Sequence, residues 1–565
     1  MPNASKPLAW QRQLILDTIV IGIAGALAAQ LFNAALRGVN ALFLEWFAGY
    51  HAPGLPSEGG TLTETIGAHG LWLVPVSLVV GALIVGVIVE RFAPEAEGHG
   101  TDAVVRAFHR ADGKLRGRVA PVKLVASALT IGSGGSAGRE GPVALTTAAL
   151  GSWFASLRDR DAEDRRLLLL MGMAAGLSAS FRSPIGTAIL AIEVLYAEME
   201  FEPGALLYTT LASIVAYAVN GFFVGWDPLF AVPDDIGKLL RPVEYGWFVV
   251  LGIGAGILAT AFPMLFYGVR DRFRGMRVHR MLKPAVGAAL TGVIVLAVPQ
   301  VIAGGYGWMQ LAIDGRLTLA TLATVTIAKM FATSFTVASG GSGGVFAPSL
   351  YVGAMLGGAL AAAAHVPAAP CVIVGMAAVF AGAGRVPIAT MMMVTEMTGG
   401  YTLLVPAATS VMLSYLVQTR LSHLLGLKHR SLYEAQVQGR ADSPAHHKAH
   451  LAIALQLIKE RNLRPTDATG EIDLVSLLQS GIPVDLPAGR RLSIGVVPKD
   501  SALIGMPAAG SGTAIGGAQT SIVAIIRGEH MLVPRPDTVL ETGDRLIVIS
   551  AADELGAVTA ALAPW

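Results

Sequence analysis

Charged side chains are scarce in this 565-residue sequence. Asp, Glu, Lys and Arg make up 14% of it, whereas hydrophobic residues make up 53%. Between Phe331 and Gly384 none of the four charged residue types occurs. With a mean hydropathy of +0.59, this composition lies outside the usual range of soluble domains and predicts a membrane protein. The formal net charge of +2 comes without a basic tract, so nothing indicates nucleic-acid binding.

Cysteine is almost absent as well. The single Cys371 excludes an internal disulfide framework and a cysteine-based metal cluster. The histidines lack metal-ligand spacing, there is no HExxH motif, and Ser136 and Ser342 lie in glycine turns without a neighbouring base. An intramembrane enzyme would need a nucleophile with a base, or metal ligands. We therefore expect no enzyme activity, no cofactor and no metal.

Long apolar runs are separated by shorter ones. The long runs cross roughly 30 Å of hydrocarbon, and they cover residues 14–36, 70–89, 204–223, 245–269, 284–303, 317–337 and 402–419. The shorter runs cover 119–131, 142–156, 167–177, 184–197 and 386–397. The pattern predicts an all-α polytopic membrane protein in which glycines and prolines break several helices.

The distribution of basic residues predicts the orientation of the chain. Residues 48–70 contain no Lys or Arg, whereas residues 91–118 contain six. By the positive-inside rule the second loop is cytoplasmic and the first is outside. We expect an integral protein of the cell (inner) membrane with both termini cytoplasmic. The acidic loop around Glu198, Glu200 and Glu202 contains no basic residue, so it is expected outside.

The sequence repeats itself internally. Residues 132–142 read GSGGSAGREGP, and residues 338–348 read ASGGSGGVFAP without a gap at one constant offset. Close behind, residues 172–193 match residues 375–396, so that Arg182, Pro184 and Glu193 coincide with residues of the same type. The repeats span about 70–223 and 245–438.

The recurring breaks predict a transport site. A broken membrane helix leaves free N–H groups and a positive dipole end within the bilayer. Two such helix starts, one from each repeat, suit an anion. A cation- or solute-coupled transporter would instead need carboxylates aimed at the cation. Tight helix packing alone also uses small residues, but it does not require repeated GSG runs that end in Pro.

The composition changes after about Arg430. We expect a pore domain at 1–438, a polar linker at 439–484 and a small α/β cytosolic domain at 485–565. In the last part, residues 491–498, 521–527, 530–534 and 545–550 are predicted strands, and residues 551–562 a closing helix.

The motif GSGGSAGREGP, together with GGVFAP, IEV and TEMTGGY, resembles the CLC family of chloride channels and chloride/proton antiporters. The resemblance covers about residues 14–438. It implies an inverted-repeat fold and a homodimer in which each subunit has its own pore, with chloride as the transported ion and the lipid membrane as the surroundings. The filter motifs that carry the resemblance contain Gly138, Arg139, Gly141, Pro142, Gly344 and Pro348.

The resemblance also implies roles for single residues. Glu140 matches the gating glutamate, for which the alternative is a fixed ion pair with Arg139. Val345 and Phe346 match the positions whose backbone N–H groups hold the central anion. Tyr433 matches the tyrosine whose hydroxyl closes that site from inside, and its alternative is an ordinary interfacial aromatic.

Two positions depart from the family pattern. His99, in GHGTD, replaces an anion-coordinating serine, and it is either an anion ligand or a loop histidine facing the cytoplasm. Val194 stands where the antiporters have an inner, proton-carrying glutamate, and valine carries no proton. The sequence therefore favours a passive or weakly coupled chloride channel with a glutamate gate. The alternative is a chloride/proton antiporter with a non-standard proton route.

The tail, in particular SIVAIIRGEHMLVPRPDTVLETGDRLIVIS, resembles the C-terminal regulatory domain of potassium-transport proteins (TrkA-C, or RCK C-terminal, type). This resemblance covers about residues 485–565. It implies a regulatory domain that binds a small cytosolic ligand.

Overall fold

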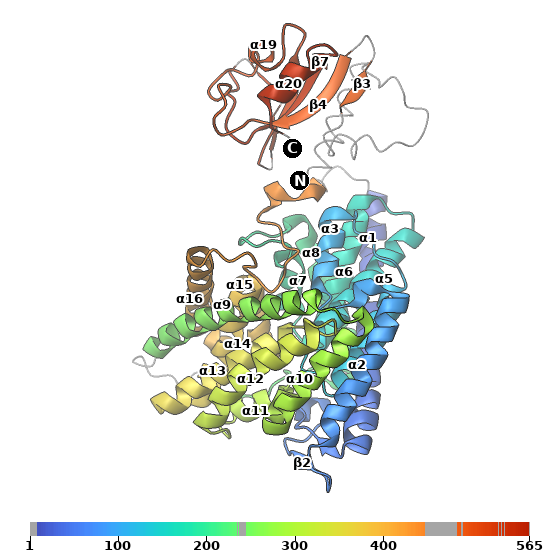
Figure 1. The fold of residues 1–565 in the computed structure, drawn as a ribbon, viewed down its shortest axis with the longest axis vertical. Coiled ribbons are helices and arrows are strands. Elements are labelled where there is room, and N and C mark those ends of the chain that lie inside the picture. Colours follow the sequence, from blue (N-terminus) through green and yellow to red (C-terminus); the bar gives the residue numbers. More distant parts are fainter. Residues whose placement is uncertain are drawn as a thin grey trace. The chain divides into compact units, whose positions relative to one another are not determined.

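The computed structural model describes residues 8–233, 236, 245–446, 483–486, 490–528, 530–532, 534–535 and 537–563. They form two compact units that divide between Gln436 and Val437 (Figure 1). Residues 447–482, which make up most of the predicted linker, lie outside the described residues.

The first unit consists of two halves with the same order of helices, as the repeat predicts. The helices of the first half are α1 (Leu8–Asn40), α2 (Leu73–Phe92), α3 (Thr101–Arg110), α4 (Val119–Gly132), α5 (Glu140–Leu157), α6 (Ala162–Phe181), α7 (Pro184–Glu193) and α8 (Pro203–Val224). Those of the second half are α9 (Tyr245–Gly275), α10 (Lys283–Ala297), α11 (Tyr306–Ile313), α12 (Leu319–Val337), α13 (Phe346–Ala364), α14 (Ala368–Gly384), α15 (Pro387–Thr398) and α16 (Leu404–Leu424).

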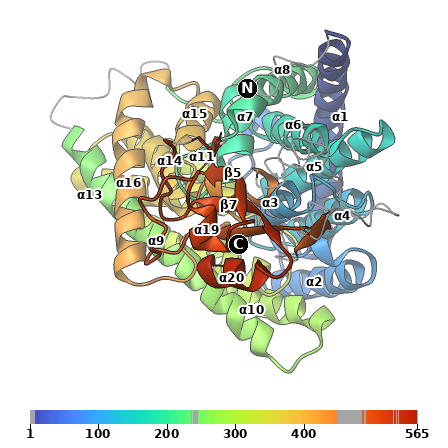
Figure 2. The ribbon, with the colours of Figure 1, turned by 90° about the horizontal axis from the view of Figure 1, so that it is seen from above.

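The two halves lie side by side. Figure 2 shows α5 and α6 on one side, and α13, α14 and α16 on the other. Helix α1 packs on α6 and α8, just as α9 packs on α14 and α16. The first repeat therefore includes α1, although the sequence repeat was recognisable only from about residue 70.

Long and short helices are mixed along the chain. Among the described residues, eight helical segments are long and apolar enough to cross a membrane, and α4, α7 and α14 are shorter apolar helices. This confirms the expected all-α polytopic fold with broken helices, because a 10-residue helix such as α7 rises only about 15 Å.

Each half contains a tight reversal between two consecutive helices. Arg182 ends α6 in the left-handed conformation (φ 54°) and Pro184 is the first residue of α7. Arg385 (φ 57°) and Pro387 repeat this geometry between α14 and α15. Proline suits the first helical position, since its missing N–H would have no partner there.

A glutamate from the opposite half satisfies the free N–H groups of each short helix. Glu396, in α15, accepts hydrogen bonds from Ile185 N at 3.1 Å and Gly186 N at 2.8 Å. Glu193, in α7, accepts from Ile388 N at 3.1 Å and Ala389 N at 2.7 Å. The two carboxylates cap the two helix starts reciprocally, which fixes α7 against α15.

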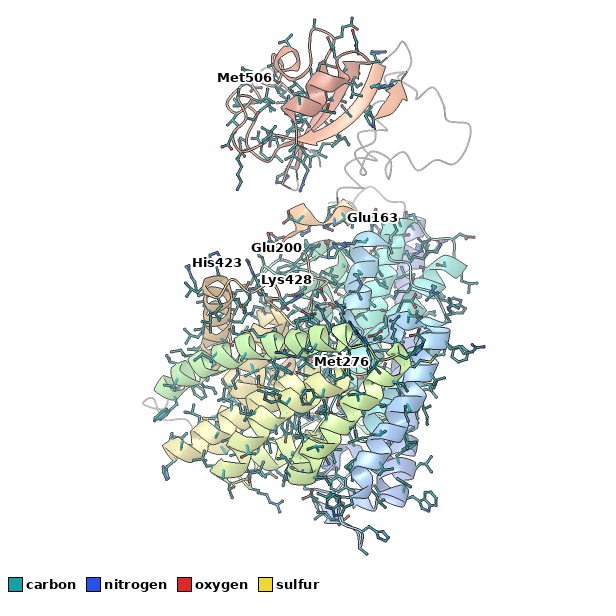
Figure 3. The ribbon with its side chains drawn as sticks, in the orientation of Figure 1. Glu163, Glu200, Met276, His423, Lys428 and Met506 are labelled. Atoms are coloured by element: carbon teal, nitrogen blue, oxygen red, sulfur yellow. The ribbon has the colours of Figure 1, made fainter. Side chains whose placement is uncertain are left out.

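The acidic loop after α7 lies at the same end as the Arg-rich loops, so the expectation that it faces the other side is wrong. His109 Nε2, at the end of α3, lies 3.1 Å from Leu195 O, and Arg166 Nε donates to Phe108 O at 3.1 Å. Figure 3 places Glu200 at the same end of the helices as Glu163. The reason is the reversal at Arg182, which turns the chain back instead of letting it cross.

The second unit is a five-stranded antiparallel sheet in the order β3-β4-β7-β5-β6. Two short helices accompany it, and Val497, Leu546 and Val558 belong to its apolar core. The described elements are β3 (Val484–Leu486), β4 (Arg490–Val496), α19 (Gly512–Ile515), β5 (Ser521–Arg527), β6 (His530–Leu532), β7 (Arg545–Ala551) and α20 (Leu555–Ala561). The four predicted strands and the closing helix are confirmed, whereas β3 was not foreseen.

Candidate functional site

The two glycine-rich breaks meet at the interface between the halves. Gly138 N donates to Gly344 O at 2.8 Å, and Gly344 N donates to Gly138 O at 2.7 Å. Helix α5 begins two residues beyond the first glycine, and α13 begins two residues beyond the second. The structure therefore brings the two predicted helix starts to one place, with Pro142 and Pro348 in their first turns, where a missing N–H costs no helical hydrogen bond.

Close backbone contacts at this junction require glycine. A Cβ atom at Gly141 would lie 2.2 Å from His99 O, and one at Gly344 would lie 2.9 Å from Gly138 O. A Cβ atom at Gly138 would lie 2.3 Å from Glu140 Oε2 and 3.1 Å from Ala347 N. Glu140 Oε2 and Ala347 N are thus close to the same position, so the Glu140 carboxylate lies beside the first turn of α13.

Paired hydroxyl groups hold the breaks in place. Ser136 Oγ lies 3.1 Å from Thr333 Oγ1, and Ser342 Oγ lies 2.8 Å from Ser127 Oγ. In the sequence repeat Ser136 corresponds to Ser342, and Ser127 corresponds to Thr333, so the two pairs are equivalent. The two serines therefore have hydroxyl groups as partners.

Two buried lysines, which sequence reasoning did not single out, brace the loops before the short helices α3 and α11. Lys123 Nζ donates to Ala96 O at 2.9 Å and to Gly98 O at 2.6 Å. Lys329 Nζ donates in the same way to Val301 O and Ala303 O, at 2.8 and 2.6 Å. Their matching positions in the two repeats were the signal that could have revealed them.

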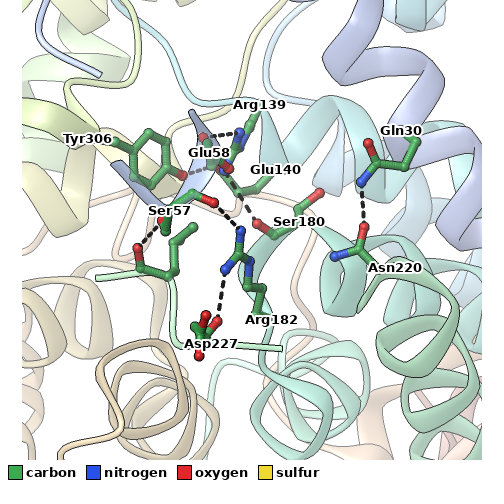
Figure 4. A network of polar contacts seen from close by, with 11 residues as sticks. Gln30, Ser57, Glu58, Arg139, Glu140, Ser180, Arg182, Asn220, Asp227 and Tyr306 are labelled. Atoms are coloured by element: carbon green, nitrogen blue, oxygen red, sulfur yellow. Dashed lines mark hydrogen bonds and ion pairs between the residues drawn. The ribbon is translucent and has the colours of Figure 1, made fainter. Parts of the chain in front are cut away.

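Glu140 is completely buried. Its Oε1 accepts a hydrogen bond from the Tyr306 hydroxyl, while Arg139 Nε is 3.8 Å away. The Arg139 guanidinium instead binds both oxygens of Glu58, at 2.5 and 3.1 Å (Figure 4). Arg139 is thus paired mainly with Glu58, and the predicted alternative of a fixed Glu140–Arg139 pair describes only the weaker of the two contacts.

Tyr306 and Glu58 are parts of the site that sequence reasoning missed. The Arg139 guanidinium lies 4.9 Å from the centre of the Tyr306 ring, a cation–π distance. Arg182 donates to Ser57 O and Asp227 O, each at 2.8 Å, and so holds the loop that carries Glu58 (Figure 4). No local motif marks either residue, because both reach the site from distant parts of the chain.

A small cavity brings several of the predicted residues together. Glu140, Phe346, Tyr433 and Val194 all line it, and each is buried. The other residues of its wall are Thr101, Gly141, Ala144, Met173, Leu177 and Leu190. Tyr433 is therefore no interfacial aromatic, and its hydroxyl is hydrogen-bonded to the Thr101 side chain. Val345 is buried beside this cavity as the residue before α13.

His99 is 6% exposed, so it is not an open loop histidine. Its Nε2 lies 3.2 Å from Asp102 Oδ2, and its ring centre is 5.5 Å from that of Tyr433. Asp102 also accepts a hydrogen bond from Ala435 N at 3.1 Å. Burial alone would raise the pKa of Asp102, but His99, Ala435 N–H and Arg106 together hold that pKa below its usual value.

A larger polar cavity of about 480 Å³ adjoins His99. Its acidic residues are paired, for example Glu97 with Arg280 and Glu434 with Arg270. The charged residues of its wall are Glu95, Glu97, Asp102, Arg106, Arg270, Arg274, Arg280, Lys283 and Glu434. This composition suits an entrance for small ions. Among the described residues no cluster of His, Cys, Asp or Glu could hold a metal ion.

The family models match both units. Residues 81–419 match the voltage gated chloride channel family, and residues 494–563 match the TrkA-C domain. The H(+)/Cl(-) exchange transporter ClcA of Salmonella agona (strain SL483) is 31% identical over 387 residues, which cover 65% of this chain and 80% of that protein. The protein of the same name from Salmonella newport (strain SL254) has the same identity and coverage.

Solved structures show the same fold. A slow cyanobacterial Cl⁻/H⁺ antiporter matches with a TM-score of 0.62 at 22% identity, over 74% of this chain and 96% of that one. A CLC-type fluoride/proton antiporter matches with a TM-score of 0.64 at 20% identity, over 77% of this chain and all of that one (100%). The chain is thus a polytopic membrane transport protein that belongs to the voltage gated chloride channel (CLC) family and carries a C-terminal TrkA-C domain.

Proposed function

We propose that this protein exchanges chloride for protons across the membrane, with Glu140 as the group that both ions compete for. The observation that carries the proposal is the buried Glu140 carboxylate at the meeting point of two helix starts, in one cavity with Tyr433 and Phe346. An ionised carboxylate is costly in such a place. A chloride ion that displaces it, or a proton that neutralises it, removes that cost, and this links the two ions.

The relatives favour exchange over passive conduction. Proteins 31% identical to this chain are named H(+)/Cl(-) exchange transporters, which supports the alternative that the sequence had placed second. The one observation in favour of a passive channel is Val194, which lines the cavity but carries no proton. Under the exchange proposal, the proton reaches Glu140 by way of another group.

In the proposed pathway, chloride enters from the polar inner cavity and passes His99 and Tyr433. It is then held by the backbone N–H groups of Val345 and Phe346 at the start of α13, where the helix dipole favours an anion. Chloride leaves outward when the Glu140 side chain moves aside. Each of these roles rests on the resemblance together with the position of the residue.

The surroundings of the pathway are proposed on the same basis. The protein functions as a homodimer in the cell (inner) membrane, with both termini cytoplasmic and one pathway in each subunit. The TrkA-C domain binds a small cytosolic ligand that regulates the pathway. The exposed apolar side chains of α8, such as Leu207, Phe222 and Phe223, are compatible with lipid or with a second subunit.

The test is proton movement in liposomes that contain the purified protein under an outward chloride gradient. We expect protons to be driven inward against their own gradient, and Glu140→Gln to abolish this while it leaves chloride efflux fast and insensitive to pH. Glu198→Gln, at an exposed position, is the matched control and should behave like the wild type. Chloride efflux without proton uptake in the wild type would refute exchange in favour of a passive channel.

A further inference from the structure

The geometry points to His99, paired with Asp102, as the group that takes protons from the inner side and delivers them to Glu140. This inference rests on the proposed exchange function. His99 lies in the loop that leads into α3. It carries the proton that Val194, which has no titratable group, cannot carry.

One ring nitrogen of His99 is free to take a proton. Nε2 faces Asp102 Oδ2 at 3.2 Å, whereas Nδ1 is buried and has no hydrogen-bond partner among the described residues. With Asp102 ionised, the neutral ring carries its hydrogen on Nε2 and its lone pair on Nδ1. A buried, unpaired nitrogen costs stability, and a proton acceptor needs this kind of lone pair.

Three charged groups, one acidic and two basic, lie near His99 on its own side of the cavity. Asp102 is the nearest, and Arg106 Nη1 lies 4.0 Å from the same Asp102 oxygen. Lys123, from α4, directs its Nζ to the carbonyl oxygens of Ala96 and Gly98, just ahead of the histidine.

On the other side of the cavity, the described acidic residues Glu97 and Glu434 are each bound to an arginine. From α9, Phe266 lies 6.3 Å from the His99 ring centre, and Arg270 is bound to Glu434 of the C-terminal segment. At the cavity wall Glu97 is bound to Arg280. His99 thus combines a carboxylate partner with a ring that lies beside Tyr433.

Tyr433 connects His99 to Glu140. Its ring stands edge-on to His99 with 5.5 Å between centres, and it also lines the small cavity that holds Glu140. Its hydroxyl is hydrogen-bonded to Thr101. A proton from the inner cavity binds His99 Nδ1, and the imidazolium passes a proton to the hydroxyl pair. That pair accepts one proton, releases another to the Glu140 carboxylate, and is unchanged at the end.

The test compares chloride efflux and chloride-driven proton uptake for His99→Ser in the full-length protein in liposomes. Serine keeps a hydroxyl for the anion, but unlike imidazole it takes up no proton near neutral pH. We expect the number of protons taken up per chloride to fall at least about tenfold, whatever the change in chloride efflux, because a positioned acid–base group typically contributes 10²–10⁴-fold. His365→Asn is the matched control, since His365 is exposed and adopts a left-handed conformation that Asn tolerates.

A second variant gives a readout that a purely structural role would not change. In the wild type, the number of protons taken up per chloride should depend on inner pH, because His99 takes its proton from that side. Asp102→Asn removes the negative partner of the imidazolium and should shift this dependence to lower inner pH, whereas the dependence on outer pH stays the same.

The outcomes separate the two proposals. A wild type without proton uptake refutes the exchange function itself. A coupled wild type whose His99→Ser variant keeps the same ratio of protons to chloride overturns the role of His99 alone, as does an Asp102→Asn variant with an unshifted inner-pH profile. Loss of proton uptake in His99→Ser, but not in His365→Asn, supports the inference.

Discussion

At the scale of single residues, the state of Glu140 depends on its immediate neighbours. Tyr306 donates directly to the carboxylate, while Arg139 gives most of its hydrogen-bonding capacity to Glu58. The carboxylate is therefore held by one direct hydrogen bond from a neutral hydroxyl and by a longer ion pair with Arg139. Such a hold is strong enough to fix the side chain, yet it can be exchanged for chloride at moderate cost.

Tyr306→Phe should loosen this hold. A hydrogen bond to a charged group contributes about 1.5–3 kcal/mol, and its loss corresponds to roughly a tenfold or larger shift of the equilibrium towards the open gate. We expect faster chloride efflux at neutral pH in a flux assay. Tyr245→Phe, which alters a half-exposed ring elsewhere, is the control. Slower or unchanged efflux in Tyr306→Phe would contradict this account of the gate.

The sequence predicted those site residues that lie in recognisable motifs. Glu140, Phe346 and Tyr433 were identified in this way, and the structure brings them to one cavity. Tyr306 and Glu58 were missed because their contacts span 166 and 81 residues and no local pattern encodes them. The burial of His99 could not be predicted from the sequence. A short polar stretch between helices has the same composition whether or not other loops cover it.

At the scale of elements, the reciprocal caps of α7 and α15 join the two halves of the molecule. Each helix start receives a carboxylate from the other half, and Glu396 accepts a third hydrogen bond from Ser183 Oγ at 2.5 Å. The two helices therefore stabilise one another, in addition to the direct packing between them. Glu193, which directly precedes Val194, has a structural role in this arrangement.

Glu396→Gln and Glu193→Gln test this structural role. A lost cap typically costs about 0.5–2 kcal/mol, so both variants should unfold at lower temperature or denaturant concentration in detergent. The effect should be larger for Glu396→Gln because of its additional bond to Ser183. Chloride-driven proton uptake per chloride should stay as in the wild type. A Glu193→Gln variant of normal stability that lost proton uptake would instead identify Glu193 as a proton carrier.

Most elements could be predicted from the sequence, because apolar runs and proline-marked starts define them locally. The start of α15, predicted at 386, lies at Pro387. The direction of α7 could not be predicted in this way. A 10-residue apolar helix followed by acidic residues fits an outward or a returning segment equally well, and the left-handed turn at Arg182 decides between them.

At the scale of the whole molecule, the residues of the proposed pathway all lie in the first unit, upstream of the division at Gln436/Val437. The segment that carries Tyr433 is anchored within that unit, since Tyr267 donates to Leu432 O at 2.9 Å and Leu432 N donates to Ala383 O at 2.8 Å. The chain continues from this segment into the TrkA-C unit, so a ligand there has a covalent route to the inner end of the pathway.

Deletion of residues 441–565 should therefore leave a folded, dimeric protein that still transports chloride, but with altered regulation. A ligand changes transport only by the difference in its affinity for the two states of the pathway. Flux and dimer stability of full-length and truncated protein, with and without candidate nucleotides, provide the comparison. Complete loss of flux from a stable dimer would place part of the transport site in the deleted segment.

The voltage at which net ion flux is zero tests the exchange of chloride for protons most directly. In liposomes that contain the wild-type protein, a tenfold chloride gradient is held constant while a tenfold proton gradient is added. If the protein exchanges the two ions, the zero-flux voltage shifts when the proton gradient is added. We predict a shift smaller than about 59 mV, which is the value for a tenfold gradient of one charge. Glu140→Gln should remove this shift. A wild-type voltage that stays at the chloride equilibrium value, whatever the proton gradient, would contradict the exchange mechanism.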